Sequence, residues 1–150
     1  MSLHRFCLHL AGCALLAVPP AVRAEAAQPD WQAWSPKVFE QAKREGRLVL
    51  LDVKAEWCVA CRKMDATGFR DPRVLDTLRQ RYISVRADID HDRDREPEIM
   101  QRYGARGVPA VVILNAEGVE IIQRHGYLEP DWLYWLLVAV ADDPRPEAHR

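Results

Sequence analysis

The chain has 150 residues, enough for one domain that buries a hydrophobic core without a scaffold of disulfides. Its 21 basic and 22 acidic residues give a formal net charge of -1, so the chain lacks the excess positive charge that favours nucleic acid as a partner. Hydrophobic residues make up 49% of the chain, a composition that is ordinary for a globular protein.

Residues 1–24 are typical of a signal peptide for export. Arg5 is followed by an apolar run to Val18, and small residues before Ala24 offer a cleavage site. The run is shorter than the roughly 20 apolar residues that a membrane span needs, so we expect no stable span and a periplasmic location. The motif "LAGC" resembles the site where bacterial lipoproteins are acylated, which leaves anchoring at Cys13 open as an alternative.

The segment 25–34 is expected to be a linker or arm whose tryptophans, Trp31 and Trp34, pack on the domain. A first helix is predicted directly after it. Ser35 is a typical N-cap, and Pro36 suits the first helical position. Gly46 marks the end of this helix.

Strand and helix signals alternate along the rest of the chain. The continuous apolar run Arg47–Ala55 is typical of a central strand that is buried on both faces. Asp71 and Pro72 are the cap and first residue of a predicted helix. The other predicted elements are a helix over Cys58–Ala66, a strand over Tyr82–Asp90, a helix that ends at Gly104, a hairpin of strands over Val108–Asn115 and Val119–Gly126, and a helix that starts at Pro130.

This order of elements predicts an α/β domain over residues 35–141. Alternating strands and helices indicate parallel crossovers, and the hairpin adds an antiparallel edge. We therefore expect a central mixed β-sheet with helices on both faces, followed by a flexible tail over residues 142–150.

The cysteines indicate the chemistry. Cleavage after Ala24 leaves only Cys58 and Cys61, and a disulfide that closes so short a loop contributes little to stability. A zinc site needs two further ligands, and the histidines that remain have no ligand-pair spacing, so we expect no metal. A reactive dithiol is the interpretation that remains.

The position of Cys58 supports that interpretation. It falls where the predicted strand gives way to a helix, so its sulfur can lie near the unpaired N–H groups of the first helical turn. Such a place favours thiolate over thiol. Cys61 lies one turn further along the same helical face, at a spacing compatible with a disulfide.

Three motifs in this order resemble the thioredoxin-like family: "VLLDVKAEWCVAC", then "YGARGVPAVVILNAEGVE", then "HGYL". The similarity spans roughly Ser35 to Val140 and is strongest to the periplasmic C-terminal domain of the thiol:disulfide interchange protein DsbD. Members of that group share the W-C-V-A-C site and an F-x-D-P-x-V segment, here Phe69–Val74. The resemblance implies a thioredoxin-like fold.

The resemblance also implies roles for residues of this chain. Cys58 would be the attacking nucleophile and Cys61 the resolving thiol, and together they would form the redox disulfide. Asp52 would exchange a proton with Cys61, which suits a buried acid with a raised pKa. Substrate binding would fall to Trp57, Val108 and Pro109, with Pro109 in a cis peptide bond that exposes backbone to an extended substrate.

Two positions depart from thioredoxin. Thioredoxin has Gly-Pro between its cysteines where this chain has Val59 and Ala60, so its redox potential does not carry over. The position where thioredoxin places a lysine near its buried aspartate holds Arg86.

The function expected from the resemblance is that of a periplasmic thiol–disulfide oxidoreductase that reduces partner proteins through a mixed disulfide and needs no cofactor. Its partners would be protein disulfides and a separate electron-donating thiol protein, and the chain would be a monomer. Two alternatives stay open. One is a disulfide oxidase or isomerase, and the other is a non-catalytic binding module on the same fold, such as a holdase or copper carrier.

Overall fold

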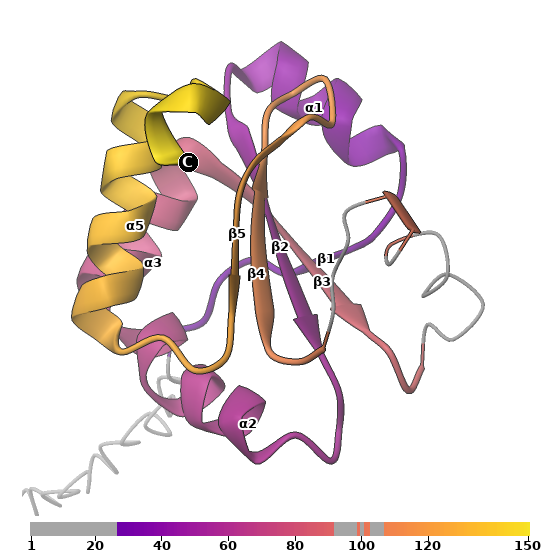
Figure 1. The fold of residues 1–150 in the computed structure, drawn as a ribbon, viewed down its shortest axis with the longest axis vertical. Helices are drawn as coiled ribbons and strands as arrows, with labels where there is room; N and C mark the ends of the chain where they lie inside the picture. Colours follow the sequence, from indigo (N-terminus) through magenta and orange to yellow (C-terminus); the bar gives the residue numbers. More distant parts are fainter. Residues whose placement is uncertain (1–26, 92–98, 100, 103–106) are drawn as a thin grey trace, which may run out of the picture.

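The computed structural model describes residues 27–91, 99, 101–102 and 107–150. These residues form an α/β fold around a five-stranded sheet with the strand order β1-β3-β2-β4-β5 (Figure 1). The predicted signal peptide and most of the helix predicted to end at Gly104 lie outside the described residues. The strands are β1 (Gln32–Ala33), β2 (Leu48–Lys54), β3 (Tyr82–Asp88), β4 (Ala110–Leu114) and β5 (Glu120–His125).

The sheet is mixed, as predicted. Strand β3 is parallel to both β1 and β2, whereas β4 is antiparallel to β2 and forms a hairpin with β5. The side chain of Asn115 closes the hairpin turn by accepting hydrogen bonds from the backbone N–H groups of Glu117 and Val119. Gly118 completes the turn with a φ of 78°, a conformation that glycine adopts without strain.

Helices cover both faces of the sheet. On one face lies α1 (Lys37–Glu45), and on the other lie α3 (Pro72–Arg81) and α5 (Pro130–Asp142), which pack against each other. Helix α2 (Val59–Ala66) lies at the end of the sheet where β2 finishes (Figure 1). A 3-10 helix, η1 (Gly68–Arg70), links α2 to α3.

The alternation of side chains along each strand divides the core into two clusters. Along β2, Val49, Leu51 and Val53 face α1, whereas Leu50 packs with α3 and α5 on the opposite face. Asp52 lies on the same face of β2 as Leu50. A buried acid therefore lies beside the core that α3 and α5 cover, near the end of the central strand.

Most predicted element boundaries are confirmed to within a few residues, and one cap is wrong. Asp71 caps α3, with its side chain accepting a hydrogen bond from the Arg73 N–H, and Pro72 is the first helical residue. Helix α1 instead begins at Lys37, with Pro36 at the cap position and no side-chain hydrogen bond to cap this end of the helix. Ser35 contributes its backbone carbonyl, which accepts a hydrogen bond from Val38.

Both ends of the described domain contain structure that the sequence did not indicate. Two residues of the expected arm form β1, and the tryptophans on either side of it pack on opposite faces of the sheet, Trp31 in the α5 core and Trp34 in the α1 core. At the other end, η2 (Pro146–His149) lies against β5, within the segment expected to be a flexible tail.

The core around α5 yields a stability prediction. Leu137 is fully buried and its neighbour Leu136 only partly so. Leu137→Ala should lower the free energy of unfolding by about 2–5 kcal/mol, because it removes buried methyl groups and leaves a cavity. Leu136→Ala is the matched control and should cost roughly 1 kcal/mol. Equal losses in urea unfolding of the two variants would contradict this description of the core.

Candidate active site

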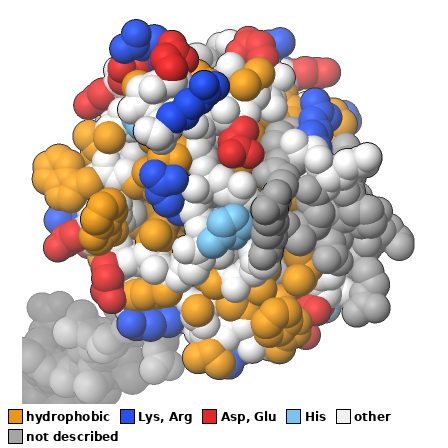
Figure 2. Space-filling model, in the orientation of Figure 1, with side chains coloured by type: hydrophobic (Ala, Val, Ile, Leu, Met, Phe, Trp, Pro, Cys, Tyr) orange, Lys and Arg blue, Asp and Glu red, His pale blue; other side chains and the backbone are white. Residues whose placement is uncertain are grey.

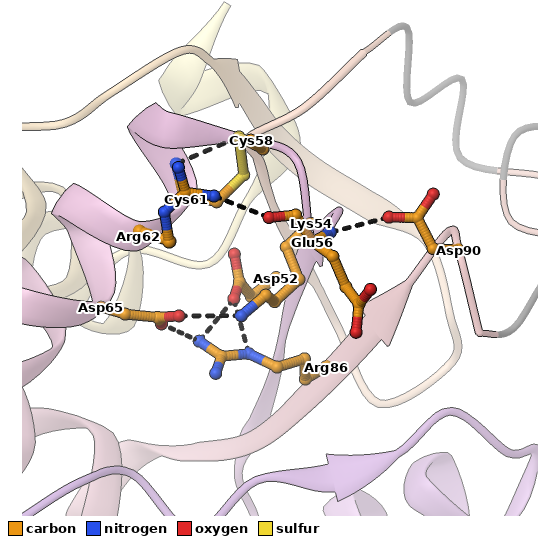
Figure 3. Close-up of a disulfide and its surroundings, with 9 residues drawn as sticks. All are labelled: Asp52, Lys54, Glu56, Cys58, Cys61, Arg62, Asp65, Arg86 and Asp90. Atoms are coloured by element: carbon orange, nitrogen blue, oxygen red, sulfur yellow. Dashed lines mark hydrogen bonds and ion pairs between the residues drawn. A yellow bond between two sulfur atoms is a disulfide. The ribbon is translucent and has the colours of Figure 1, made fainter.

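The two cysteines lie at the junction between β2 and α2. Cys58 is the N-cap of α2, with extended dihedral angles of φ -77° and ψ 103°, so its side chain turns toward the open end of the helix. A disulfide joins it to Cys61, and the two Cα atoms are 5.3 Å apart (Figure 3). The expected positions of both cysteines on one helical turn are thus the observed ones.

The first turn of α2 points a backbone donor at the Cys58 sulfur. The N–H of Cys61 donates a hydrogen bond to Sγ of Cys58 over 3.0 Å. In the reduced protein the same N–H group, at the positive end of the helix dipole, would favour negative charge on that sulfur. This geometry suits a nucleophilic Cys58.

The loop before the cysteines is held in place from two sides. The carboxylate of Asp90 accepts a hydrogen bond from the Glu56 N–H over 2.7 Å, and Arg62 donates to the Glu56 carbonyl over 2.7 Å (Figure 3). The Ile89 N–H donates to the carbonyl of Lys54 over 2.9 Å. These bonds fix the chain that leads from the buried strand to Cys58.

The surroundings of the disulfide are apolar. Cys58 and Cys61 are only 4% and 3% exposed, and they cluster with Ala55. Three partly buried side chains pack against that cluster: Ala60, Ile89 and Val108. The fold therefore brings Val108, which is distant in sequence, to the cysteine pair.

The other predicted substrate-binding residues differ in exposure. The Val108–Pro109 peptide bond is cis, and Pro109 is buried with its carbonyl accepting a hydrogen bond from the Gly126 N–H. The side chain of Trp57 is 66% exposed, and that of its near neighbour Val59 is 70% exposed. In the orientation of Figure 1, hydrophobic side chains are spread along the lower edge of the molecule, where α2 begins (Figure 2). Apolar surface therefore flanks the disulfide.

Asp52 lies in β2 directly beside Arg86 of β3, its partner in the parallel register. The Arg86 guanidinium donates a hydrogen bond from Nε to one Asp52 oxygen over 2.8 Å, and Nη2 lies 2.7 Å from the same oxygen in an ion pair. Burial raises the pKa of Asp52 from 3.8 to about 6, and the positive charge of Arg86 opposes that rise. In Figure 3 Asp52 is seen between the disulfide and Arg86.

Two further charged residues extend this ion pair, and the sequence analysis missed both. Arg86 also binds the carboxylate of Asp65, and Lys54 donates to the other Asp65 oxygen over 2.8 Å. Simple periodicity could have identified them. Asp65 follows Cys61 by one helical turn, and Lys54 shares the strand face of Asp52.

Metal ligation and membrane spanning find no support in the residues that the structure describes. Within these residues, no group of three or more His, Cys, Asp or Glu side chains is placed to hold a metal ion. Over the same residues, the helices are too short or too polar to cross a bilayer.

The raised pKa of Asp52 makes stability depend on pH. An acid whose pKa is higher in the folded than in the unfolded chain binds its proton more tightly when folded, so stability falls as pH rises from 3.8 to about 6. Asp52→Asn should therefore raise the free energy of unfolding at about pH 7.5 by on the order of 2 kcal/mol, and far less at about pH 4.

Asp76→Asn is the matched control, since the Asp76 side chain on α3 is 69% exposed. Urea unfolding of both variants at the two pH values checks the prediction. A gain for Asp52→Asn that is the same at both pH values would show that the ionised carboxylate is not the source of the instability.

Comparison with known proteins places this site in a family. A family model described as thioredoxin-like matches residues 30–116. The thiol:disulfide interchange protein DsbD 2 of Pseudomonas aeruginosa is 40% identical over 79 residues, which are 53% of this chain and 13% of that protein. The similarity therefore concerns a small part of a much longer relative.

Solved structures share the fold. A thioredoxin from Thermus thermophilus superposes with a TM-score of 0.67 at 21% identity, over 83% of this chain and 98% of that one. The C-terminal domain of DsbD from Neisseria meningitidis, in its reduced form, gives a TM-score of 0.60 at 21% identity, over 68% of this chain and 89% of that one. The family match runs from the arm to the turn of the β4–β5 hairpin, more than half of the chain, and the chain thus belongs to the thioredoxin-like family.

Proposed function

We propose that the protein is a periplasmic thiol–disulfide oxidoreductase that reduces disulfides of partner proteins with the Cys58–Cys61 dithiol. The observation that carries the proposal is the hydrogen bond from the Cys61 N–H to the Cys58 sulfur at the start of α2. A sulfur that accepts such a bond is ionised to a larger extent near neutral pH and is a better leaving group than an ordinary cysteine, because its thiolate is stabilised.

The reaction begins with the reduced dithiol and ends with the disulfide that the structure contains. The Cys58 thiolate attacks one sulfur of the partner disulfide, and the partner's other sulfur leaves as a thiolate and takes up a proton. Cys61 then loses its proton and attacks the Cys58 sulfur, which breaks the mixed disulfide and releases the second partner sulfur. Two electrons pass to the partner, which leaves reduced while this protein becomes oxidised.

Asp52 is the proposed acceptor of the Cys61 proton. Its pKa of about 6 means that it is mostly ionised near neutral pH yet still basic enough to hold a proton briefly. Burial supplies the basicity, and Arg86 keeps the carboxylate from staying protonated at working pH.

Partner proteins would dock on the apolar surface beside the disulfide. Trp57 and Val59 offer exposed hydrophobic area, and Val108 packs against the cysteine cluster itself. The backbone of Val108, directly before the cis-proline Pro109, would pair with an extended segment of the partner around its cystine.

Location and electron supply belong to the same proposal. Residues 1–24 would direct export and be removed, with acylation at Cys13 as the alternative. A relative that is named a thiol:disulfide interchange protein supports exchange between dithiol and disulfide, and we favour the reducing direction from the resemblance to the C-terminal domain of DsbD. A separate thiol protein would then return electrons to the Cys58–Cys61 disulfide. The protein would act as a monomer, without metal or organic cofactor.

Two cysteine variants test the proposal. The wild-type protein, supplied with dithiothreitol, should accelerate reduction of insulin disulfides, and Cys58→Ser should reduce the rate to that of dithiothreitol alone. Cys61→Ala, reduced and then freed of dithiothreitol before insulin is added, should instead accumulate a covalent adduct with the substrate, because neither the resolving thiol nor a small thiol is present to break it. Non-reducing gels and intact mass spectrometry detect the adduct.

The double variant Cys58→Ser/Cys61→Ala is the control for adducts that form at other sites. Unchanged activity in Cys58→Ser would overturn the proposal. Stoichiometric binding without turnover in the wild type would favour the binding module, and a net gain of disulfides in a reduced substrate would favour the oxidase.

A further inference from the structure

Trp31, from the arm that precedes the first helix, covers the buried ion pair of the active site. Its ring centroid lies 3.9 Å from the guanidinium carbon of Arg86. The indole is held in turn by Phe69, whose ring meets it edge-on with centroids 4.9 Å apart. Pairing of β1 with β3 sets Ala33 opposite Arg86, which fixes the arm at this point.

Arg86 is engaged on its edges and on a face. Its N–H groups bind Asp52 and Asp65, while its planar face is covered by the Trp31 ring. An arginine side chain is long and flexible. An ion pair that it forms is therefore weak when the guanidinium can move into water. The stack restrains the guanidinium, and a cation over an indole face is itself favourable.

The charges that face Asp52 come from three elements. Arg86 approaches from β3, Asp65 from α2 and Lys54 from its own strand, β2. Arg86 and Lys54 lower the pKa of Asp52, whereas burial and Asp65 raise it. Of these groups, Arg86 is the one that Trp31 touches in the stack.

We propose that Trp31 is a positioning residue for the active site: by stacking on Arg86 it keeps the positive charge beside Asp52 and thereby sets the pH at which Asp52 can accept a proton. The consequence for turnover rests on the proposed role of Asp52 as proton acceptor. The coupling between Trp31 and Arg86 does not rest on that role, because the stack is present in the oxidised protein whether or not the protein is an enzyme.

Removing the indole has two opposite effects on Asp52. A looser Arg86 stabilises the carboxylate less and raises the midpoint of its titration, whereas water that enters in place of the ring lowers it. Only the first effect requires Arg86. A double-mutant cycle separates the two, because the effect of water persists when Arg86 is absent.

The experiment titrates the Asp52 carboxyl carbon by NMR in the oxidised full chain of the wild type, Trp31→Leu, Arg86→Gln and the double variant. Arg86→Gln should raise the midpoint by about one pH unit or more, since an opposite charge is lost at contact distance. The shift that Trp31→Leu causes should be roughly 0.5 pH unit more positive when Arg86 is present than in the Arg86→Gln background, about threefold in proton affinity. Trp31→Phe, which keeps an aromatic face, should retain part of the coupling.

Trp34→Phe is the matched control, because Trp34 packs in the α1 core on the opposite face of the sheet. It should lower the melting temperature and leave the Asp52 midpoint unchanged. Identical shifts for Trp31→Leu with and without Arg86, or no shift in either background, would overturn the inference. If Trp31→Leu does not fold, the same cycle with Trp31→Met, which also removes the aromatic face, decides, and absence of coupling there overturns the inference equally.

Failure of this inference can be distinguished from failure of the proposed function. Coupling in the NMR titration together with no insulin reduction would leave this inference intact and remove the oxidoreductase. Normal insulin reduction without coupling in the NMR titration would support the oxidoreductase and overturn the positioning role of Trp31.

Discussion

The structure depends most on one contact, the hydrogen bond that the first turn of α2 directs at the sulfur of Cys58. It exists because a buried central strand delivers the chain to the open end of a helix, where backbone N–H groups have no partner within the helix. The side chains of Asp90 and Arg62 hold the intervening loop, so that Cys58 and no neighbouring residue occupies the cap. Chemistry at the sulfur follows from this placement.

Below the disulfide, two acids and two bases are arranged so that their charges balance. Asp52 and Asp65 would by themselves oppose negative charge on a nearby sulfur, but Arg86 and Lys54 bind them directly. Near neutral pH the charges of these four residues largely cancel. The positive end of the α2 dipole is then the main electrostatic influence on the sulfur of Cys58. Burial of Asp52 nevertheless leaves it more basic than an ordinary aspartate, which is the property that the proposed proton exchange requires.

Periodicity and capping residues predicted most of the fold. The apolar run that became β2, the Asp71–Pro72 start of α3 and the terminal hairpin are each local signals, and each appears in the structure. Strand β1 was missed because two residues carry no periodicity, and its pairing with β3 is a tertiary contact. Ser35 was assigned as a cap because its residue type is typical of one, yet the helix begins one residue later than expected and no side chain caps it.

The active site was predictable in part. The cysteine spacing and the resemblance pointed to Cys58, Cys61 and Asp52, whereas the partners of Asp52 depend on the register of β2 against β3 and on the packing of α2. The stack of Trp31 on Arg86 joins residues that lie far apart in the chain, and no local pattern indicates it. Sequence thus located the reactive pair, and the fold revealed the charges that surround it.

The central claim is that Cys58, and not Cys61, is the reactive sulfur. It is tested most directly by treating the reduced protein at neutral pH with less than one equivalent of iodoacetamide and measuring each alkylated cysteine by peptide mass spectrometry. The account predicts that Cys58 is modified at least about tenfold faster than Cys61, because only its thiolate is stabilised by the helix end. Equal rates, or faster modification of Cys61, would contradict it.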